Sequence, residues 1–333
     1  MRLLAVRADR GVDMTKRASV GWICFIVVLC TLLLRIASSL DIYSALNIAD
    51  SDAFFTCVVQ VAIFAFLSVF LYSLGAKGRG ERAKDVVSDF GFTKISAKNW
   101  LLIIPMCVCA IAVSIGISFV WQFALRMMGF THIPSSTDYS GLDVLFKELF
   151  LVAVLPGVCE EIAHRGLIRA GYRECKWKYV LVSAILFSLM HQNIVQTGYT
   201  FFFGATLALI TYYTGSIWGG ILIHFANNAY SVISGYASQN GGIFGFIATA
   251  ENWFYSSNLG FAVAAAIVVV CACLLVLFFF IMRKDAQKKE RISSVPFESA
   301  SDVLPLHKDL PFMLTVAVGI AATIFSFVWG MTR

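Results

Sequence analysis

Residues 144–158 read "VLFKELFLVAVLPGV", and the residues that follow, 159–172, read "CEEIAHRGLIRAGY". The first segment is apolar along most of its length, whereas the second brings two adjacent carboxylates, a histidine and several arginines. A helix that crosses the ~30 Å hydrocarbon core of a membrane needs about 20 mostly apolar residues. An ionisable side chain inside such a helix costs from ~2.5 to over 10 kcal/mol, so a functional role is its default interpretation.

The composition of the whole chain agrees with a membrane location for this stretch. Of the 333 residues, 59% are hydrophobic and 14% are charged, whereas a soluble domain is about 45–50% apolar and about 25% charged. We therefore expect a polytopic membrane protein without a large water-soluble domain. The sequence has no C-x-x-C pair among its nine cysteines, so a cysteine zinc site or a dithiol redox motif is not indicated.

Long apolar runs recur along the chain and predict an all-α fold, a bundle of about eight or nine transmembrane helices. The stretch quoted above supplies the fourth run, and the two C-terminal runs are the clearest. The candidate spans are 19–39, 53–75, 99–122, 143–165, 178–195, 197–214, 217–237, 259–282 and 310–330.

The loops between these runs differ in charge, and Lys and Arg in loops indicate the cytoplasmic side. Four basic segments fall on one side if nine spans are counted, and the loops on the other side are acidic or neutral. We expect this protein in the plasma membrane of a bacterium, with its N-terminus in the cytoplasm and its C-terminus outside. The basic segments are the N-terminal tail, the loop after the second span, the loop after the fourth span, and "RKDAQKKER" at 283–291.

Two further expectations follow from the charge distribution and the N-terminal sequence. The net charge of +6 marks topology rather than nucleic-acid binding, so the expected partners are the lipid bilayer and a membrane substrate. The tail 1–20 is polar and basic and lacks a clear cleavage site, which predicts a retained signal-anchor helix. Met14 is an alternative start, because "MTKR" also makes a good cytoplasmic flank.

Ionisable groups within the predicted spans fall in three places, of which the first is the quoted stretch. Glu160 and Glu161 are neighbours, and neighbouring helical residues point about 100° apart, so they face different surroundings. Glu161 and Arg165 are four residues apart and can form an ion pair. One carboxylate is then neutralised structurally while the other stays free for chemistry.

The second place is "FSLMHQN" with His191, and the third is "HFANN", where His224 and Asn228 are four residues apart on one helix face. Asn227 lies near that face as well, so the spacing leaves the two amides as alternatives. Counting the helical rise from the predicted cytoplasmic ends puts all three places in the inner or middle part of the membrane. A carboxylate, two imidazoles and an amide at one depth can activate water and stabilise an oxyanion.

The motifs "EEIAHR", "FSLMH" and "HFANN", in this order, resemble the signature E-E-x-x-x-R, F-x-x-x-H and H-x-x-x-N. That signature characterises the CAAX protease and bacteriocin-processing (CPBP or Abi) family of intramembrane glutamate endopeptidases. The resemblance covers roughly residues 143–237. It implies a catalytic core at 143–237, between N-terminal tail and transmembrane helices at 1–142 and C-terminal transmembrane helices at 238–333.

Carried over by position, the resemblance implies that Glu160 activates water with His191 assisting, and that His224 and Asn228 stabilise the oxyanion. Glu161 and Arg165 correspond to the supporting pair. The implied activity is hydrolysis of a peptide bond in a membrane-associated or lipidated protein or peptide, as in CAAX processing or in bacteriocin maturation and immunity. The resemblance implies no cofactor, although two histidines and a glutamate are also a possible zinc set.

Other interpretations of the same residues stay open at this point. A zinc-dependent membrane protease could use the same cluster, and a transporter or scaffold could use it as a proton or ligand site. The sequence has no H-E-x-x-H motif and no G-x-S-x-G motif, which disfavours a zincin and a serine hydrolase of that kind. His164 falls between the motif positions and is left out of the catalytic set. Phe187 is interpreted as packing that orients His191.

Overall fold

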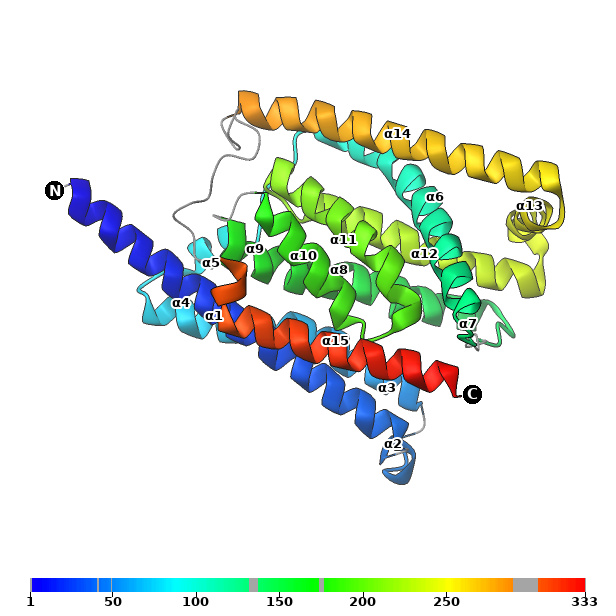
Figure 1. The fold of residues 1–333 in the computed structure, drawn as a ribbon, viewed down its shortest axis with the longest axis horizontal. Coiled ribbons are helices and arrows are strands. Elements are labelled where there is room, and N and C mark those ends of the chain that lie inside the picture. Colours follow the sequence, from blue (N-terminus) through cyan, green and yellow to red (C-terminus); the bar gives the residue numbers. More distant parts are fainter. Residues whose placement is uncertain are drawn as a thin grey trace.

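A computed structural model describes residues 2–40, 42–48, 50–131, 137–173, 177–289 and 305–332 (Figure 1). These residues form helices and turns, with no strand in the described part of the chain, so the predicted all-α fold is confirmed. In chain order the helices are α1 (Arg2–Ser39), α2 (Ile42–Ala45), α3 (Ser51–Cys57), η1 (Val58–Leu67), α4 (Ser68–Gly78), α5 (Ala83–Asp89), α6 (Ala97–Met127), α7 (Leu142–Glu148), η2 (Leu149–Val154), α8 (Leu155–Glu161), η3 (Ile162–Leu167), α9 (Ile168–Tyr172), α10 (Lys178–Met190), α11 (Ile194–Thr214), α12 (Trp218–Asn240), η5 (Gly242–Phe244), α13 (Gly245–Ser256), α14 (Asn258–Lys288), η6 (Leu306–Lys308) and α15 (Leu310–Met331).

Six helices are long and apolar enough to cross a membrane, so the chain is an integral membrane protein. They are Lys16–Ser39, Ser51–Gly78, Ala97–Met127, Ile194–Thr214, Asn258–Lys288 and Leu310–Met331. The predicted count of eight or nine is therefore not confirmed. The remaining predicted spans are 143–165, 178–195 and 217–237.

These three segments are helical but differ from simple apolar spans for identifiable reasons. The helix from α7 to α9 carries Glu160, Glu161 and Arg165, and the segment 217–237 carries a histidine and two asparagines. Helix α10 has 13 residues, which at 1.5 Å per residue reach only about 20 Å. The three segments that fall short of the apolar criterion are therefore the three that carry the predicted motifs.

A tight turn joins α10 to α11, and α10 ends before the predicted span 178–195 does. The chain leaves α10 at His191, Gln192 adopts a positive φ of 51°, and the Asn193 side chain accepts a hydrogen bond from the Val195 backbone N–H at 3.0 Å. An asparagine in this position satisfies a free N–H at a helix start. The turn consequently places His191 at the very end of α10, close to the centre of the bundle.

The bundle has two ends that polar contacts between distant segments define. At the first, Lys16 at the start of the apolar part of α1 binds Asp89, the last residue of α5, at 2.6 Å. Lys98 at the start of α6 pairs with Asp285 near the end of α14 at 3.6 Å. At the other, Lys147 in α7 binds Asp50 at 2.6 Å. Figure 1 shows the N-terminus at the left with the first end and the C-terminus at the right with the second.

Helix α8 lies in the middle of this arrangement, packed against α12 and η1. Wider π-helical turns occur directly before it in η2, directly after it in η3, and across from it in η1. Gly157 allows α8 to approach α12 closely, because a Cβ at this position would lie 3.2 Å from backbone atoms of Phe225. Interruptions of this kind in α-helical winding are frequent at functional sites, and here they flank Glu160.

Candidate active site

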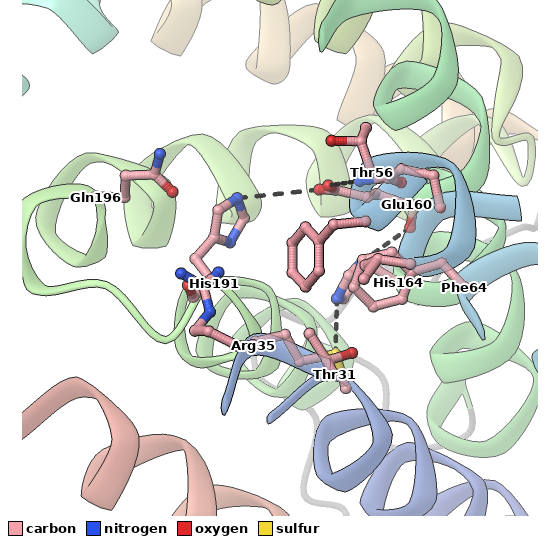
Figure 2. Close-up of a pocket in the computed structure, with 12 residues that line it drawn as sticks. Thr31, Arg35, Thr56, Phe64, Glu160, His164, His191 and Gln196 are labelled. Atoms are coloured by element: carbon pink, nitrogen blue, oxygen red, sulfur yellow. Dashed lines mark hydrogen bonds and ion pairs between the residues drawn. The ribbon is translucent and has the colours of Figure 1, made fainter. Parts of the chain in front are cut away.

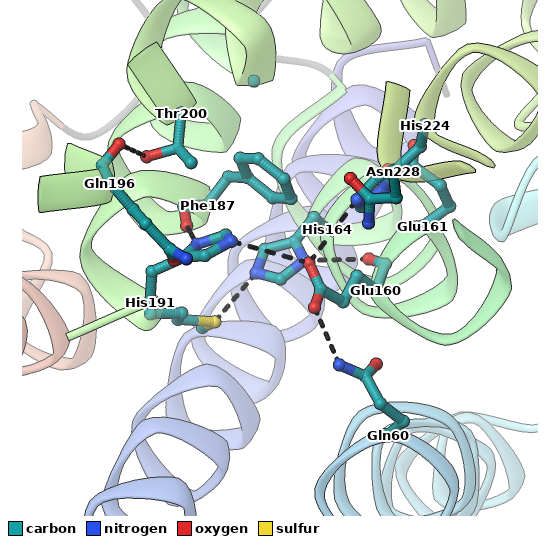
Figure 3. Close-up of polar contacts among 12 residues, drawn as sticks. Gln60, Glu160, Glu161, His164, Phe187, His191, Gln196, Thr200, His224 and Asn228 are labelled. Atoms are coloured by element: carbon teal, nitrogen blue, oxygen red, sulfur yellow. Dashed lines mark hydrogen bonds and ion pairs between the residues drawn. The ribbon is translucent and has the colours of Figure 1, made fainter. Parts of the chain in front are cut away.

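Glu160 projects from α8 towards His191 of α10 and His224 of α12 (Figure 3). Its Oε2 atom lies 3.9 Å from His191 Nε2 and 4.0 Å from His224 Nε2. Oε2 is buried and has no hydrogen-bond partner, whereas Oε1 accepts a hydrogen bond from Gln60 Nε2 at 2.8 Å. The structure therefore brings together the carboxylate and both histidines that the sequence predicted.

Glu161 is fully buried and contacts His224 through the other ring nitrogen, Nδ1. Its Oε1 accepts a hydrogen bond from Arg165 at 2.8 Å and another from His224 Nδ1 at 2.9 Å. A Cβ at Gly220 would lie 2.5 Å from Glu161 Oε2, so glycine at that position leaves room for the carboxylate. The expected ion pair between Glu161 and Arg165 is present, and it also fixes one nitrogen of His224.

Phe187 packs at the centre of this network. Its ring centroid lies 4.9 Å from that of His191 and 5.6 Å from that of His224, both edge-on. The guanidinium carbon of Arg165 lies over the ring, 4.2 Å from its centroid. The Phe187 backbone carbonyl also accepts a hydrogen bond from His191 Nδ1 at 2.6 Å. This residue thus orients the histidines, as the sequence interpretation held.

His164 is buried and packs against Phe187, with ring centroids 5.0 Å apart. Its Nδ1 lies 2.8 Å from the Glu160 backbone oxygen, and its Nε2 lies 3.0 Å from the Met190 sulfur. Both ring nitrogens therefore have a neighbour within the protein, which agrees with leaving this histidine out of the catalytic set.

Asn228 and Asn227 lie side by side on α12, and both are half-buried. Asn228 Nδ2 donates to the Val152 backbone oxygen at 2.9 Å, and its Oδ1 accepts from Asn227 Nδ2 at 3.3 Å. A primary amide has two N–H donors, so Asn228 keeps one donor beyond the bond to Val152. The two amides form one linked unit, and the contacts do not select between them.

Two cavities meet at Glu160 and His191. The larger has a volume of about 1000 Å³ and is lined by His224, Asn227 and Asn228 as well as by polar residues of α6 and α11. The smaller, of about 120 Å³, lies between α1, η1 and the end of α10 (Figure 2). The residues that line both are Thr56, Gln60, Glu160, His191 and Gln196. The polar cluster therefore lies at the wall between a wide chamber and a narrow pocket.

The part of the chain that holds the three motifs also matches a known protein family. Residues 143–230 match the family model described as Type II CAAX prenyl endopeptidase Rce1-like. The match confirms the resemblance that the three motifs carried, and it lies within the predicted core of 143–237. Searches of curated proteins and of solved structures gave no match.

The sequence interpretation missed two residues that contact the site, Gln60 and Arg35. Gln60 binds Glu160 from 100 positions away, and its only signal was an amide inside the apolar span 53–75. Arg35 lies in the predicted span 19–39, donates to the His191 backbone oxygen at 3.2 Å, and lines the narrow pocket. An ionisable side chain inside a span was a sufficient signal for Arg35, by the same rule that singled out Glu160.

The zinc alternative can be compared with these distances. In a tetrahedral zinc site with bonds of about 2.0–2.1 Å, neighbouring ligand atoms lie about 3.3 Å apart. Glu160 Oε2 is 3.9 Å from His191 Nε2 and 4.0 Å from His224 Nε2. Within the described ranges, no group of three His, Cys, Asp or Glu side chains is arranged to hold a metal ion. The residues as placed do not fit a tetrahedral zinc ion.

Proposed function

We propose that the Glu160 site hydrolyses peptide bonds in membrane-associated or lipidated proteins or peptides. The observation that carries this proposal is the buried, unpartnered Oε2 atom of Glu160, which faces two imidazole nitrogens across 3.9 and 4.0 Å. The family description of residues 143–230 as a CAAX prenyl endopeptidase supports the same reaction. In this proposal the chain is an intramembrane endopeptidase of the glutamate type.

The separation between Glu160 and His191 suits a water molecule. Polar atoms 3.9 Å apart are too distant for a direct hydrogen bond, and a bridging water satisfies atoms at such a separation. Glu160 accepts a proton from this water while the water oxygen attacks the carbonyl carbon of the scissile bond. The same proton then passes to the amide nitrogen as the C–N bond breaks, so that the carboxylate is regenerated.

The hydrogen bonds of the two imidazoles assign them different tasks. Carbonyl and carboxylate oxygens only accept, so His191 Nδ1 donates to Phe187 and His224 Nδ1 donates to Glu161. A neutral imidazole then has a lone pair on Nε2. His191 keeps this neutral form and accepts a hydrogen bond from the attacking water, since its Nδ1 partner is an uncharged carbonyl.

In this proposal both ring nitrogens of His224 carry a hydrogen, and Nδ1–H donates to the carboxylate of Glu161. Its Nε2–H, together with the remaining N–H of Asn228, donates to the carbonyl oxygen that becomes negative as water adds. Donors arranged in advance around such an oxygen act mainly in the transition state. Glu161 and Arg165 support the chemistry by holding His224 in place.

The test compares cleavage in cells that produce the wild-type chain or the Glu160→Gln variant. Protein termini in the membrane fractions are identified by mass spectrometry, and termini that require Glu160 are the expected products. Asp52→Asn is the matched control, because Asp52 is an exposed carboxylate at the start of α3. If wild type and Glu160→Gln yield the same termini, the proposed hydrolysis is wrong and a transporter or scaffold becomes the better interpretation.

A further inference from the structure

Basic side chains gather at one end of the bundle. Hydrogen bonds hold the segments of this end together, such as Ile217 N–H to Gly91 O at 3.0 Å and Arg169 to Asp89 O at 2.6 Å. We call it the basic end, and its basic residues are Lys16, Arg17, Lys77, Arg79, Arg82, Lys84, Lys94, Lys98, Arg169, Arg173, Arg283, Lys284, Lys288 and Lys289.

The opposite end has the reverse charge balance. In the part of the chain that the structure describes, its basic residues are Arg126 and Lys147, with Arg35 one turn inside α1. Its acidic residues are Asp50, Asp52, Asp138, Asp143 and Glu148. Lys and Arg accumulate on the cytoplasmic side of membrane proteins, so the charges indicate that the basic end is cytoplasmic.

The large cavity extends from Glu160 towards the opposite end. Helix α6 runs away from the basic end, and the cavity is lined by residues of its second half, from Ser114 to Arg126. Helix α11 runs towards the basic end, since Gly215 O accepts a hydrogen bond from Thr93 at 2.9 Å, and it lines the cavity with its first half, from Val195 to Phe203. On both helices, the residues that line the cavity are therefore those farther from the basic end.

A polar stripe on α6 marks the route along this cavity. Ser114, Ser118, Gln122 and Arg126 follow one another at intervals of four residues, so they lie on one face of the helix, and all four line the cavity. The stripe covers about 18 Å along the helix axis. Polar side chains in a membrane-spanning helix face the bundle interior or a water-filled space, and this stripe leads from mid-membrane to the helix end.

The far wall of the cavity is polar as well. Glu251 of α13 lines it and accepts hydrogen bonds from the hydroxyls of Tyr230 at 2.6 Å and Ser234 at 2.8 Å. A carboxylate held by neutral hydroxyls is compatible with water at this wall rather than with lipid chains.

We propose that substrates and water reach Glu160 from the end opposite the basic end, which is the extracytoplasmic side of the membrane. The segment that is cleaved is then one exposed on, or inserted from, that side, rather than the terminus of a protein held at the cytoplasmic leaflet. The statement on cleavage rests on the proposed function, whereas the statement on access does not depend on any catalysis.

The experiment measures from which side the cavity can be labelled. Ser231 of α12 lines the cavity and is exposed. Full-length Ser231→Cys is treated with a charged, membrane-impermeant maleimide in sealed right-side-out and inverted vesicles. Peptide mass spectrometry reads modification at residue 231 itself, so the nine native cysteines do not obscure it. Ser88→Cys, on the exposed face of α5 at the basic end, is the matched control.

We expect Ser231→Cys to be labelled in right-side-out vesicles and to lose labelling in inverted ones, and Ser88→Cys to behave in the opposite way. Gln122→Cys, on the α6 stripe, repeats the measurement in case Ser231→Cys does not fold. If both cavity variants are labelled only in inverted vesicles, equally in both preparations, or in neither, the proposed access is wrong. Outer-side labelling without any Glu160-dependent cleavage would instead leave the access intact and remove the proposed function.

Discussion

The two sides of α8 differ although the sequence gives them identical residues. On the cavity side, Glu160 has one carboxylate oxygen bound to Gln60 and the other without a partner. On the packed side, Glu161 is fully buried, its Oε1 binds both Arg165 and His224, and its Oε2 likewise has no hydrogen-bond partner. The two carboxylates therefore differ in the ion pair to Arg165 and in the cavities, both of which Glu160 lines. An ion-paired carboxylate stabilises structure, whereas a carboxylate that lines a cavity is placed to exchange a proton with water.

Replacing the cavity carboxylate should have the largest effect on activity. Glu160→Gln keeps an oxygen that can accept from Gln60 and removes the proton acceptor, so we expect turnover to fall by about 10²–10⁴-fold while the yield of folded protein stays near wild type. The measurement is cleavage of a reporter peptide derived from the Glu160-dependent termini, with thermal unfolding in detergent alongside. A Glu160→Gln protein that cleaves at the wild-type rate would contradict the assignment of Glu160 as the base.

Breaking the packed side should act on stability instead. Arg165→Met leaves Glu161 buried beside His224 without its guanidinium partner, and removing one member of a buried ion pair costs about 3–5 kcal/mol. We expect a large decrease in thermal stability and in folded yield, and a similar decrease for Glu161→Gln, which strands Arg165. Equal loss of folded protein in Glu160→Gln would show that the two sides of α8 do not divide the work in this way.

His224, one of the two proposed oxyanion donors, links the cavity side and the packed side of α8. Its Nδ1 contacts Glu161, and its Nε2 faces Glu160. Loss of one oxyanion donor typically costs about 10²–10³ in turnover, so we expect losses of this size for His224→Ala and Asn228→Ala with substrate binding retained. The assay pairs cleavage with a separate binding measurement on the uncleaved peptide. Near-normal turnover of Asn228→Ala together with loss in Asn227→Ala would move the role to the neighbouring amide.

A chelator applied to the same preparation tests the zinc alternative. With water activated by Glu160 and His191 without a metal ion, we expect turnover to be unchanged by chelation. Inactivation that added zinc reverses would make His191 and His224 metal ligands and would require the three side chains to draw closer than the 3.9 and 4.0 Å that separate Glu160 from the imidazoles.

Local patterns predicted a substantial part of this site. The spacing of four between Glu161 and Arg165 indicated their pair, and three motifs on separate segments indicated one cluster, since helices of alternating direction can bring equal depths together. The helical fold followed from apolar run length. These features depend on residues near one another in sequence or on counts along a helix, so one sequence was enough to infer them.

Other features depend on packing between distant segments and left weak signals. The predicted span count is not confirmed by the six long apolar helices, because the segments that carry the motifs are short or polar. Gln60 meets Glu160 across 100 positions. The polar stripe of α6 consists of uncharged residues that cost little in a membrane helix one at a time, together with Arg126, which lies beyond the predicted span 99–122. Which side of α8 faces a cavity is a property of the assembled bundle and cannot be obtained from helical periodicity alone.

The smallest expected effect concerns Gln60, which distinguishes the two oxygens of Glu160. Its bond at 2.8 Å holds Oε1 and leaves Oε2 turned towards the histidines. A hydrogen bond to a charged group contributes about 1.5–3 kcal/mol. Part of this loss is recovered if water replaces the amide, so we expect Gln60→Met to lower kcat on the order of tenfold.

Thr56→Val is the matched control for this change, because Thr56 lies one turn away and lines the same two cavities. Its turnover should stay near wild type. Gln60→Glu should be more damaging than Gln60→Met, since a second carboxylate beside Glu160 repels its charge and competes for the same proton. If Gln60→Met and Thr56→Val are equally active, the bond does not position the carboxylate, and the orientation of Oε2 must come from the packing of α8 against η1 alone.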